Sequence, residues 1–176
     1  MRIMALSGSL RSGSLNTAIL EAVEILAPPP WDIRIFRGLG GLPPFTPDLE
    51  DRLPAAVYGF RQEAASADAL LIACPEYAGG IPGAFKNALD WLVGCERFDS
   101  RPVMLLNVSP HAVAAEAALR LVLRTMSAPV MEPASRRIPV RDRKATAASL
   151  AADPAVRQSL LDGLSALEAS LGARPA

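Results

Sequence analysis

The chain has 176 residues, of which 51% are hydrophobic and 20% are charged, and its 18 basic and 18 acidic side chains leave no formal net charge. This is the size and composition of one globular domain, which we expect to span residues 1–176 with disorder in the last few. The balanced charge excludes the general electrostatic attraction that nucleic-acid binding needs. One His and two Cys outside any CxxC motif are too few for the usual zinc sites.

Apolar periodicity predicts strands and helices in alternation along the whole chain. Strands are predicted at residues 2–7, 31–38, 69–74 and 102–108, with a weaker one around Val130. Helices are predicted at 15–26, 55–66, 82–93, 114–126 and 154–171, whereas 38–54 and 132–146 have no regular pattern. No apolar stretch reaches the ~18 residues of a membrane span. The first apolar run is also too short for a signal peptide, so we expect a cytoplasmic protein without a membrane partner.

Such alternation is typical of a three-layer α/β domain, in which a parallel sheet carries helices on both faces. Ligands of open α/β sheets bind outside the carboxyl ends of the strands. Three loops are expected to leave strands at that edge, namely residues 7–16, 75–83 and 108–113. The sequence therefore indicates where a functional site would lie before any motif is considered.

The first of these loops, "GSLRSGS", is longer than a strand-to-helix turn requires. Its glycines and short side chains allow backbone N–H groups to converge, and the following helix adds unpaired N–H groups and a positive dipole end. Together with the guanidinium of Arg11, these groups would bind an anion, most often a phosphate. The alternative is that Ser14 or Asn16 merely caps the helix, which would explain neither Arg11 nor the loop length.

The loop lacks the motifs of two common classes of phosphate-binding protein, and this limits the type of phosphate that it could bind. Gly8 and Gly13 have the spacing of a P-loop, but Ser14 and Leu15 stand where its Lys and Ser/Thr belong. The dinucleotide fingerprint GxGxxG also fails, because no second glycine follows at the required position. A monophosphate bound without a metal fits this loop better than a nucleotide triphosphate or a dinucleotide.

Two motifs resemble the NAD(P)H-dependent FMN reductases, a family that includes quinone, azo-dye and chromate reductases. "GSLRSGSLN" is similar to their GSxRxxSxN loop, and "PEYAGGIPGAFKNALDWL" is similar to their PEYNxSxPGxLKNAIDW signature. The resemblance implies a flavodoxin-like fold with a five-stranded parallel sheet in the order 2-1-3-4-5. It also implies FMN as cofactor, NADPH or NADH as co-substrate, and a homodimer or homotetramer.

The resemblance also implies roles for particular residues. Ser9, Arg11, Ser14 and Asn16 would bind the FMN phosphate, with the backbone of Leu15 beside them. Pro75, Glu76 and Tyr77 would lie along the ribityl chain and the ring edge, where Ala78, Gly79 and Gly80 allow close backbone approach. In the third loop Ser109 is retained, and His111 or the backbone of Ala112 would replace missing contacts to the flavin.

The sequence departs from the family pattern in the second and third loops. Ala78 and Gly80 stand where the family has Asn and Ser, and "SPHAVAAEAALR" lacks the usual glycines after the fourth strand. For His111, a contact near flavin N1/O2 and an exposed loop position are equally compatible with the sequence. For Glu76, a structural role is favoured over acid–base work.

These features lead us to expect a flavoenzyme that passes hydride from NAD(P)H through FMN to a quinone or similar acceptor by ping-pong kinetics. No catalytic side chain or metal is expected, because the cofactor carries the chemistry. The main alternative is a flavin-binding electron carrier or sensor that meets a protein partner, although the balanced charge does not provide an acidic docking face. A phosphate-binding hydrolase using Glu76 would lack a base partner and metal ligands.

Overall fold

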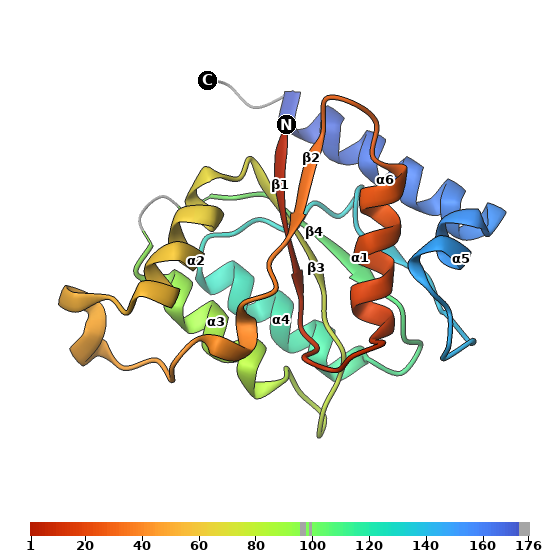
Figure 1. Ribbon diagram of the computed structural model, residues 1–176. Helices are drawn as coiled ribbons and strands as arrows, with labels where there is room; N and C mark the ends of the chain where they lie inside the picture. Colours follow the sequence, from red (N-terminus) through yellow and green to blue (C-terminus); the bar gives the residue numbers. More distant parts are fainter. Residues whose placement is uncertain (96–97, 99, 173–176) are drawn as a thin grey trace.

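The computed structural model describes residues 1–95, 98 and 100–172, so the disorder expected in the last few residues falls largely at 173–176, outside the described residues. Five parallel strands form one sheet in the order β2-β1-β3-β4-β5, as predicted (Figure 1). The strands are β1 (Arg2–Ser7), β2 (Asp32–Ile35), β3 (Ala69–Ala73), β4 (Val103–Asn107) and β5 (Arg136–Arg137). In the described part of the chain, no helix combines the length and the apolarity that crossing a membrane requires.

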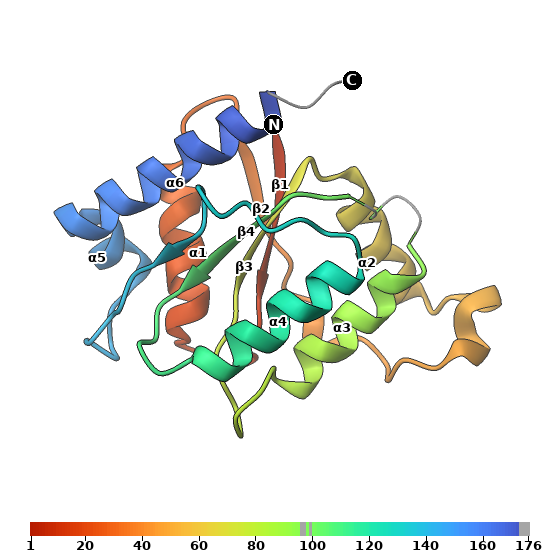
Figure 2. The ribbon, with the colours of Figure 1, turned by 180° about the vertical axis from the view of Figure 1, so that it is seen from behind.

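Helices cover both faces of this sheet (Figures 1 and 2). The helices are α1 (Leu15–Leu26), α2 (Ala55–Ser66), α3 (Gly83–Val93), α4 (Val113–Thr125), α5 (Ala147–Ala152) and α6 (Pro154–Gly172). Helices α1, α5 and α6 pack on one face, and α2, α3 and α4 pack on the other. The three-layer arrangement follows directly from the alternation of the sequence.

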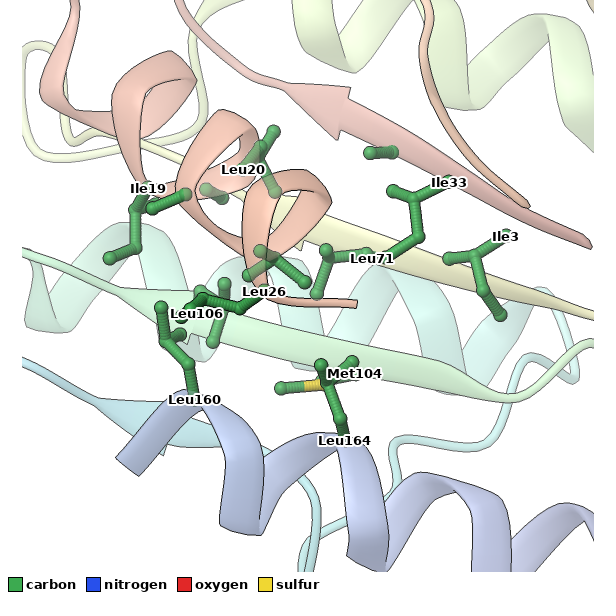
Figure 3. Packing of buried hydrophobic residues seen from close by; sticks show 14 of the residues in the cluster. Ile3, Ile19, Leu20, Leu26, Ile33, Leu71, Met104, Leu106, Leu160 and Leu164 are labelled. Atoms are coloured by element: carbon green, nitrogen blue, oxygen red, sulfur yellow. The ribbon is translucent and has the colours of Figure 1, made fainter. Parts of the chain in front are cut away.

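The middle of each central strand is apolar, and its successive side chains enter opposite cores. In β1, Ile3 and Ala5 face α1 and α6, whereas Met4 and Leu6 face α2 and α3. Figure 3 shows the first of these cores, in which residues of α1 and α6 meet residues of the sheet. Two continuous cores hold the middle of the sheet rigid, and this rigidity fixes the positions of the loops at its edge.

The predicted fifth strand is wrong in position. Val130 forms only an isolated bridge to Val103, and the strand proper is Arg136–Arg137, which pairs with the end of β4. Between them the chain turns, and the Ser135 hydroxyl accepts a hydrogen bond from the backbone N–H of Leu105 at 3.0 Å. That side chain takes the place of a strand carbonyl. An edge strand made of two arginines has no apolar pattern for sequence reasoning to detect.

Short helices were missed in two segments. Helix α5 begins at a capping box in which Thr146 and Ser149 exchange hydrogen bonds, and Asp153 then caps α6. Residues 38–54, expected to be irregular, contain two short 3-10 helices, η1 (Leu39–Gly41) and η2 (Pro47–Arg52). Buried Arg61 anchors this segment, since its guanidinium binds the carboxylate of Glu50 and the carbonyl of Trp91.

Candidate functional site

The three predicted loops leave the sheet at one edge, at the bottom of Figure 1. The register aligns Ser7 of β1 with Ala73 of β3, and Ala73 with Leu106 of β4. The strands therefore end at nearly the same level, and the segments that follow them start side by side. The backbone N–H of Gly8 continues this pairing, because it donates to the carbonyl of Ala73 at 2.8 Å.

The first loop turns into α1 without a side-chain cap. Ser14 is the N-cap residue, but its hydroxyl accepts no hydrogen bond from the helix. Gly13 makes the turn with φ of 69°, a left-handed conformation that glycine adopts without strain. The first N–H groups of any α-helix lack intrahelical acceptors, and here no side-chain cap replaces them. The capping alternative considered for Ser14 is therefore not what the structure shows.

The first loop and the start of α1 contain buried polar side chains. Ser9, Ser14 and Asn16 are all buried. The Asn16 Oδ1 atom has no hydrogen-bond partner among the described residues. A buried acceptor without a donor is costly, about 1–3 kcal/mol, so such a group in a native site usually has a ligand or water as its partner.

A pocket of about 200 Å³ lies in front of these groups. It is lined by Ser9, Arg11, Gly13, Ser14, Leu15, Asn16, Pro75, Tyr77 and Arg143. Ser9 also joins the first two loops, since its hydroxyl lies 3.2 Å from the Tyr77 hydroxyl. The pocket thus combines an uncapped helix N-terminus with two guanidinium groups, neither of which forms an ion pair within the described residues.

The second loop contains a tight turn from Tyr77 to Gly80. The backbone N–H of each of these two residues donates to the carbonyl of the other at 3.0 Å, and the central Ala78 and Gly79 have φ of 49° and 73°. Two positive φ values identify a type I′ turn, which favours Asn followed by Gly. Alanine at the first central position is therefore strained. Tyr77 lines the pocket, whereas Ala78, Gly79 and Gly80 do not.

Replacing Ala78 with Asn is expected to raise the free energy of unfolding by about 0.5–1 kcal/mol, because Asn tolerates the left-handed conformation better than Ala. Urea denaturation measures the change. Ala117→Asn on the exposed face of α4 is the matched control, and it should lower stability by several tenths of a kcal/mol, since Asn is a poorer helix former. Destabilisation by Ala78→Asn would contradict the assignment of strain.

Glu76 has a structural contact. Its Oε2 atom accepts a hydrogen bond from the backbone N–H of Ala115 at 2.9 Å, in the first turn of α4. A carboxylate there satisfies an unpaired N–H group and complements the helix dipole. The side chain therefore ties the second loop to α4, in line with the structural role favoured from the sequence.

The third loop is held by a residue that sequence reasoning missed. Asn107 accepts a hydrogen bond from the N–H of Ser109 at 2.9 Å and donates to the carbonyl of Ala112 and to Glu116. The Ser109 hydroxyl in turn accepts from the N–H of His111 at 3.2 Å. His111 is exposed, and neither Ser109 nor His111 lines the 200 Å³ pocket. Asn107 gives this glycine-poor loop a defined shape.

Glu116 remains ionised beside Asn107. Burial raises the pKa of this carboxyl, but hydrogen bonds from Asn107, Arg120 and Arg137 outweigh burial and hold the pKa below its usual value. Arg137 reaches Glu116 from β5 at 2.9 Å. Strand β5, whose position the sequence did not predict, thus helps to hold the third loop in place through Arg137.

Cys74 directly follows β3 and precedes Pro75, which lines the pocket. Burial raises the pKa of its thiol from 9.0 to about 12, and the thiol donates to the carbonyl of Pro75. A thiol in this state behaves as a small apolar side chain. Among the described residues, moreover, no three His, Cys, Asp or Glu side chains are grouped as metal ligands would be.

Alkylation should therefore be slow at Cys74 in the folded protein. In a Cys95→Ser variant at pH 8, iodoacetamide should label Cys74 about a thousandfold more slowly than in the urea-unfolded chain, since a pKa near 12 instead of 9.0 leaves that much less thiolate. The rate should rise steadily with pH over the range in which the protein stays folded. Equal rates in the folded and unfolded chains would show that the thiol is not shielded.

Taken together, these observations define a parallel α/β protein with a pocket between β1 and α1 whose lining suits a phosphate-type anion. Residues 1–139 match the family described as NADPH-dependent FMN reductase, and the chain belongs to this family. The resemblance carried by the two loop motifs is thereby confirmed.

Curated relatives agree with this family. The chain is 41% identical over 91 residues to a 2-hydroxy-1,4-benzoquinone reductase of a Burkholderia species, covering 52% of this chain and 49% of the relative. It is 38% identical over 112 residues to an NAD(P)H-dependent FMN reductase of Pseudomonas aeruginosa, covering 62% of this chain and 60% of that protein. The matches thus span about half the length of these relatives.

The fold has a solved counterpart as well. FerB, a flavoenzyme NAD(P)H:(acceptor) oxidoreductase from Paracoccus denitrificans, superimposes with a TM-score of 0.80 over 95% of both chains at 24% sequence identity. This similarity confirms the predicted flavodoxin-like fold.

Proposed function

We propose that this protein is an NAD(P)H-dependent oxidoreductase that binds FMN and reduces a quinone or similar electron-poor acceptor. The observation that carries the proposal is the pocket in front of α1, where the unpartnered Asn16 Oδ1 lies beside an uncapped helix N-terminus and two arginines. FMN suits these groups. Its phosphate would meet the N–H groups and Arg11, and a ribityl hydroxyl would supply the donor that Asn16 lacks.

When bound, FMN supplies the hydride chemistry. The residues of this chain would bind the FMN and orient it. Arg11 and the first turn of α1 hold the phosphate, and Pro75 and Tyr77 line the same pocket, where the ribityl chain would run. The turn Tyr77–Gly80 and the loop fixed by Asn107 would border the flavin ring. With both loops tied to α4, by Glu76 and by Asn107, the site would be shaped before the ligand binds.

Steady-state kinetics tests the proposed reaction. The purified protein loaded with FMN should oxidise NADPH or NADH when a quinone is present, and double-reciprocal plots should be parallel, as expected when co-substrate and acceptor bind in turn. An electron carrier or sensor would retain FMN but would need a separate reductase. Bound FMN without NAD(P)H oxidation would therefore favour the carrier and contradict the enzyme.

We further propose a homodimer or homotetramer in which a second copy covers the open sheet edge. Trp91 and Leu92 of α3 are buried within the chain itself, so an interface at this edge would use exposed side chains of the first two loops, such as Leu10 and Tyr77. Light scattering should give a mass of two or four times 18.6 kDa. A monomer that turns over at full rate would contradict this assembly.

A further inference from the structure

A second, larger hollow opens beside the phosphate pocket. It has a volume of about 680 Å³, within the range of roughly 300–1,000 Å³ typical of small-molecule sites. The hollow and the pocket share five lining residues, Ser9, Arg11, Gly13, Ser14 and Arg143. A phosphate held in the pocket therefore borders the hollow, and a group attached to that phosphate has space to continue into it.

The hollow is strongly basic, although the chain as a whole has no net charge. Four cationic side chains line it, Arg11, Arg37, Arg143 and Lys144, against one carboxylate, that of Glu21. Arg37 is paired with Glu21 at 2.8 Å. The other three cations form no ion pair within the described residues, so they are available to a ligand with more than one phosphate.

Part of the lining is apolar. Ile35, Phe36 and Leu39, at and after the end of β2, contribute to it. The Phe36 ring is half-buried and is fixed in place by the Phe60 ring, with centroids 4.7 Å apart. An aromatic ring held in this way offers a surface to a flat base. Cationic and apolar linings together suit a nucleotide, which has an anionic phosphate and a stacking base.

We propose that this hollow binds the adenosine 5′-phosphate half of FAD, so that the chain accepts FAD as well as FMN. The proposal rests on the proposed flavin site. In FAD that half is joined directly to the flavin phosphate, and the shared lining of pocket and hollow provides this continuity. Lys144 and Arg143 would bind the second phosphate, and the wall formed by Ile35, Phe36 and Leu39 would receive the adenine.

Calorimetric titration of the 176-residue chain, freed of flavin, with FMN and with FAD tests the proposal. Wild-type protein should bind FAD at least as tightly as FMN. Lys144 lines the hollow but not the phosphate pocket, so Lys144→Ser should weaken FAD binding about fivefold and leave FMN binding within twofold. Arg157→Ser, which removes a cation from the exposed surface of α6, should change neither affinity.

Three results would overturn the proposal. In the first, FAD binds the wild type more than tenfold more weakly than FMN. In the second, Lys144→Ser changes both affinities equally. In the third, Lys144→Ser raises the KM for NADPH of the FMN-loaded protein with FAD affinity unchanged, which would assign the hollow to the co-substrate. If FMN binds and FAD does not, only this inference fails, whereas binding of neither flavin would also remove the proposed function.

Discussion

Replacing Arg11 with alanine is expected to weaken FMN binding by at least about tenfold. Arg11 is exposed in the free protein but lines the phosphate pocket, and a hydrogen bond to a charged group is worth about 1.5–3 kcal/mol. Titration of the apo-protein with FMN, followed by quenching of flavin fluorescence, gives the affinity directly.

Arg157→Ala is the matched control for Arg11, because it removes the same charge from the surface of α6 and should leave the affinity for FMN unchanged. The free energy of unfolding of both variants should stay close to that of the wild type, since neither side chain is buried. Unchanged FMN affinity in the Arg11→Ala variant would show that the guanidinium does not bind the FMN phosphate.

Replacing Gly8 with alanine is expected to lower the free energy of unfolding by about 1–3 kcal/mol. A Cβ atom at this position would lie 3.0 Å from Cys74 Sγ and 3.1 Å from both Cys74 Cα and Pro75 Cδ. Backbone and a proline ring cannot move aside easily, so the first two loops would be pushed apart. Because residues of both loops line the pocket, FMN affinity should fall as well.

Gly59→Ala is the control. Gly59 lies on the exposed face of α2, and a Cβ atom added there would have no other atom within 4 Å. This variant should raise stability by up to about 1 kcal/mol, because alanine is a better helix former than glycine. Urea denaturation of the two variants should thus give shifts of opposite sign. A stabilising Gly8→Ala would show that the loops are not closely packed at this position.

Most of the fold could be predicted because its central strands are continuous apolar runs and its helices have clear periodic stripes. The prediction failed where packing information is absent from local sequence. Arg136 and Arg137 form a strand only because the end of β4 offers them an edge. Helix α5 begins at a capping box at Thr146. Its six residues are too few for a helical pattern to show in the sequence.

The site divides in the same way. Seven of the thirteen predicted residues line one pocket, and most of them could be grouped from the sequence because they belong to one local loop. Arg143 joins that pocket from a segment more than 120 residues further along the chain, and only the fold brings it there. Asn107 carried a weak signal, as a polar residue that ends an apolar strand.

Comparing FMN with riboflavin, which differs by the phosphate alone, tests the phosphate site most directly. We predict that apo-protein binds FMN at least about 100-fold more tightly than riboflavin, and that Arg11→Ala reduces this ratio. Equal affinities for the two flavins would contradict the binding of a flavin phosphate by the loop between β1 and α1.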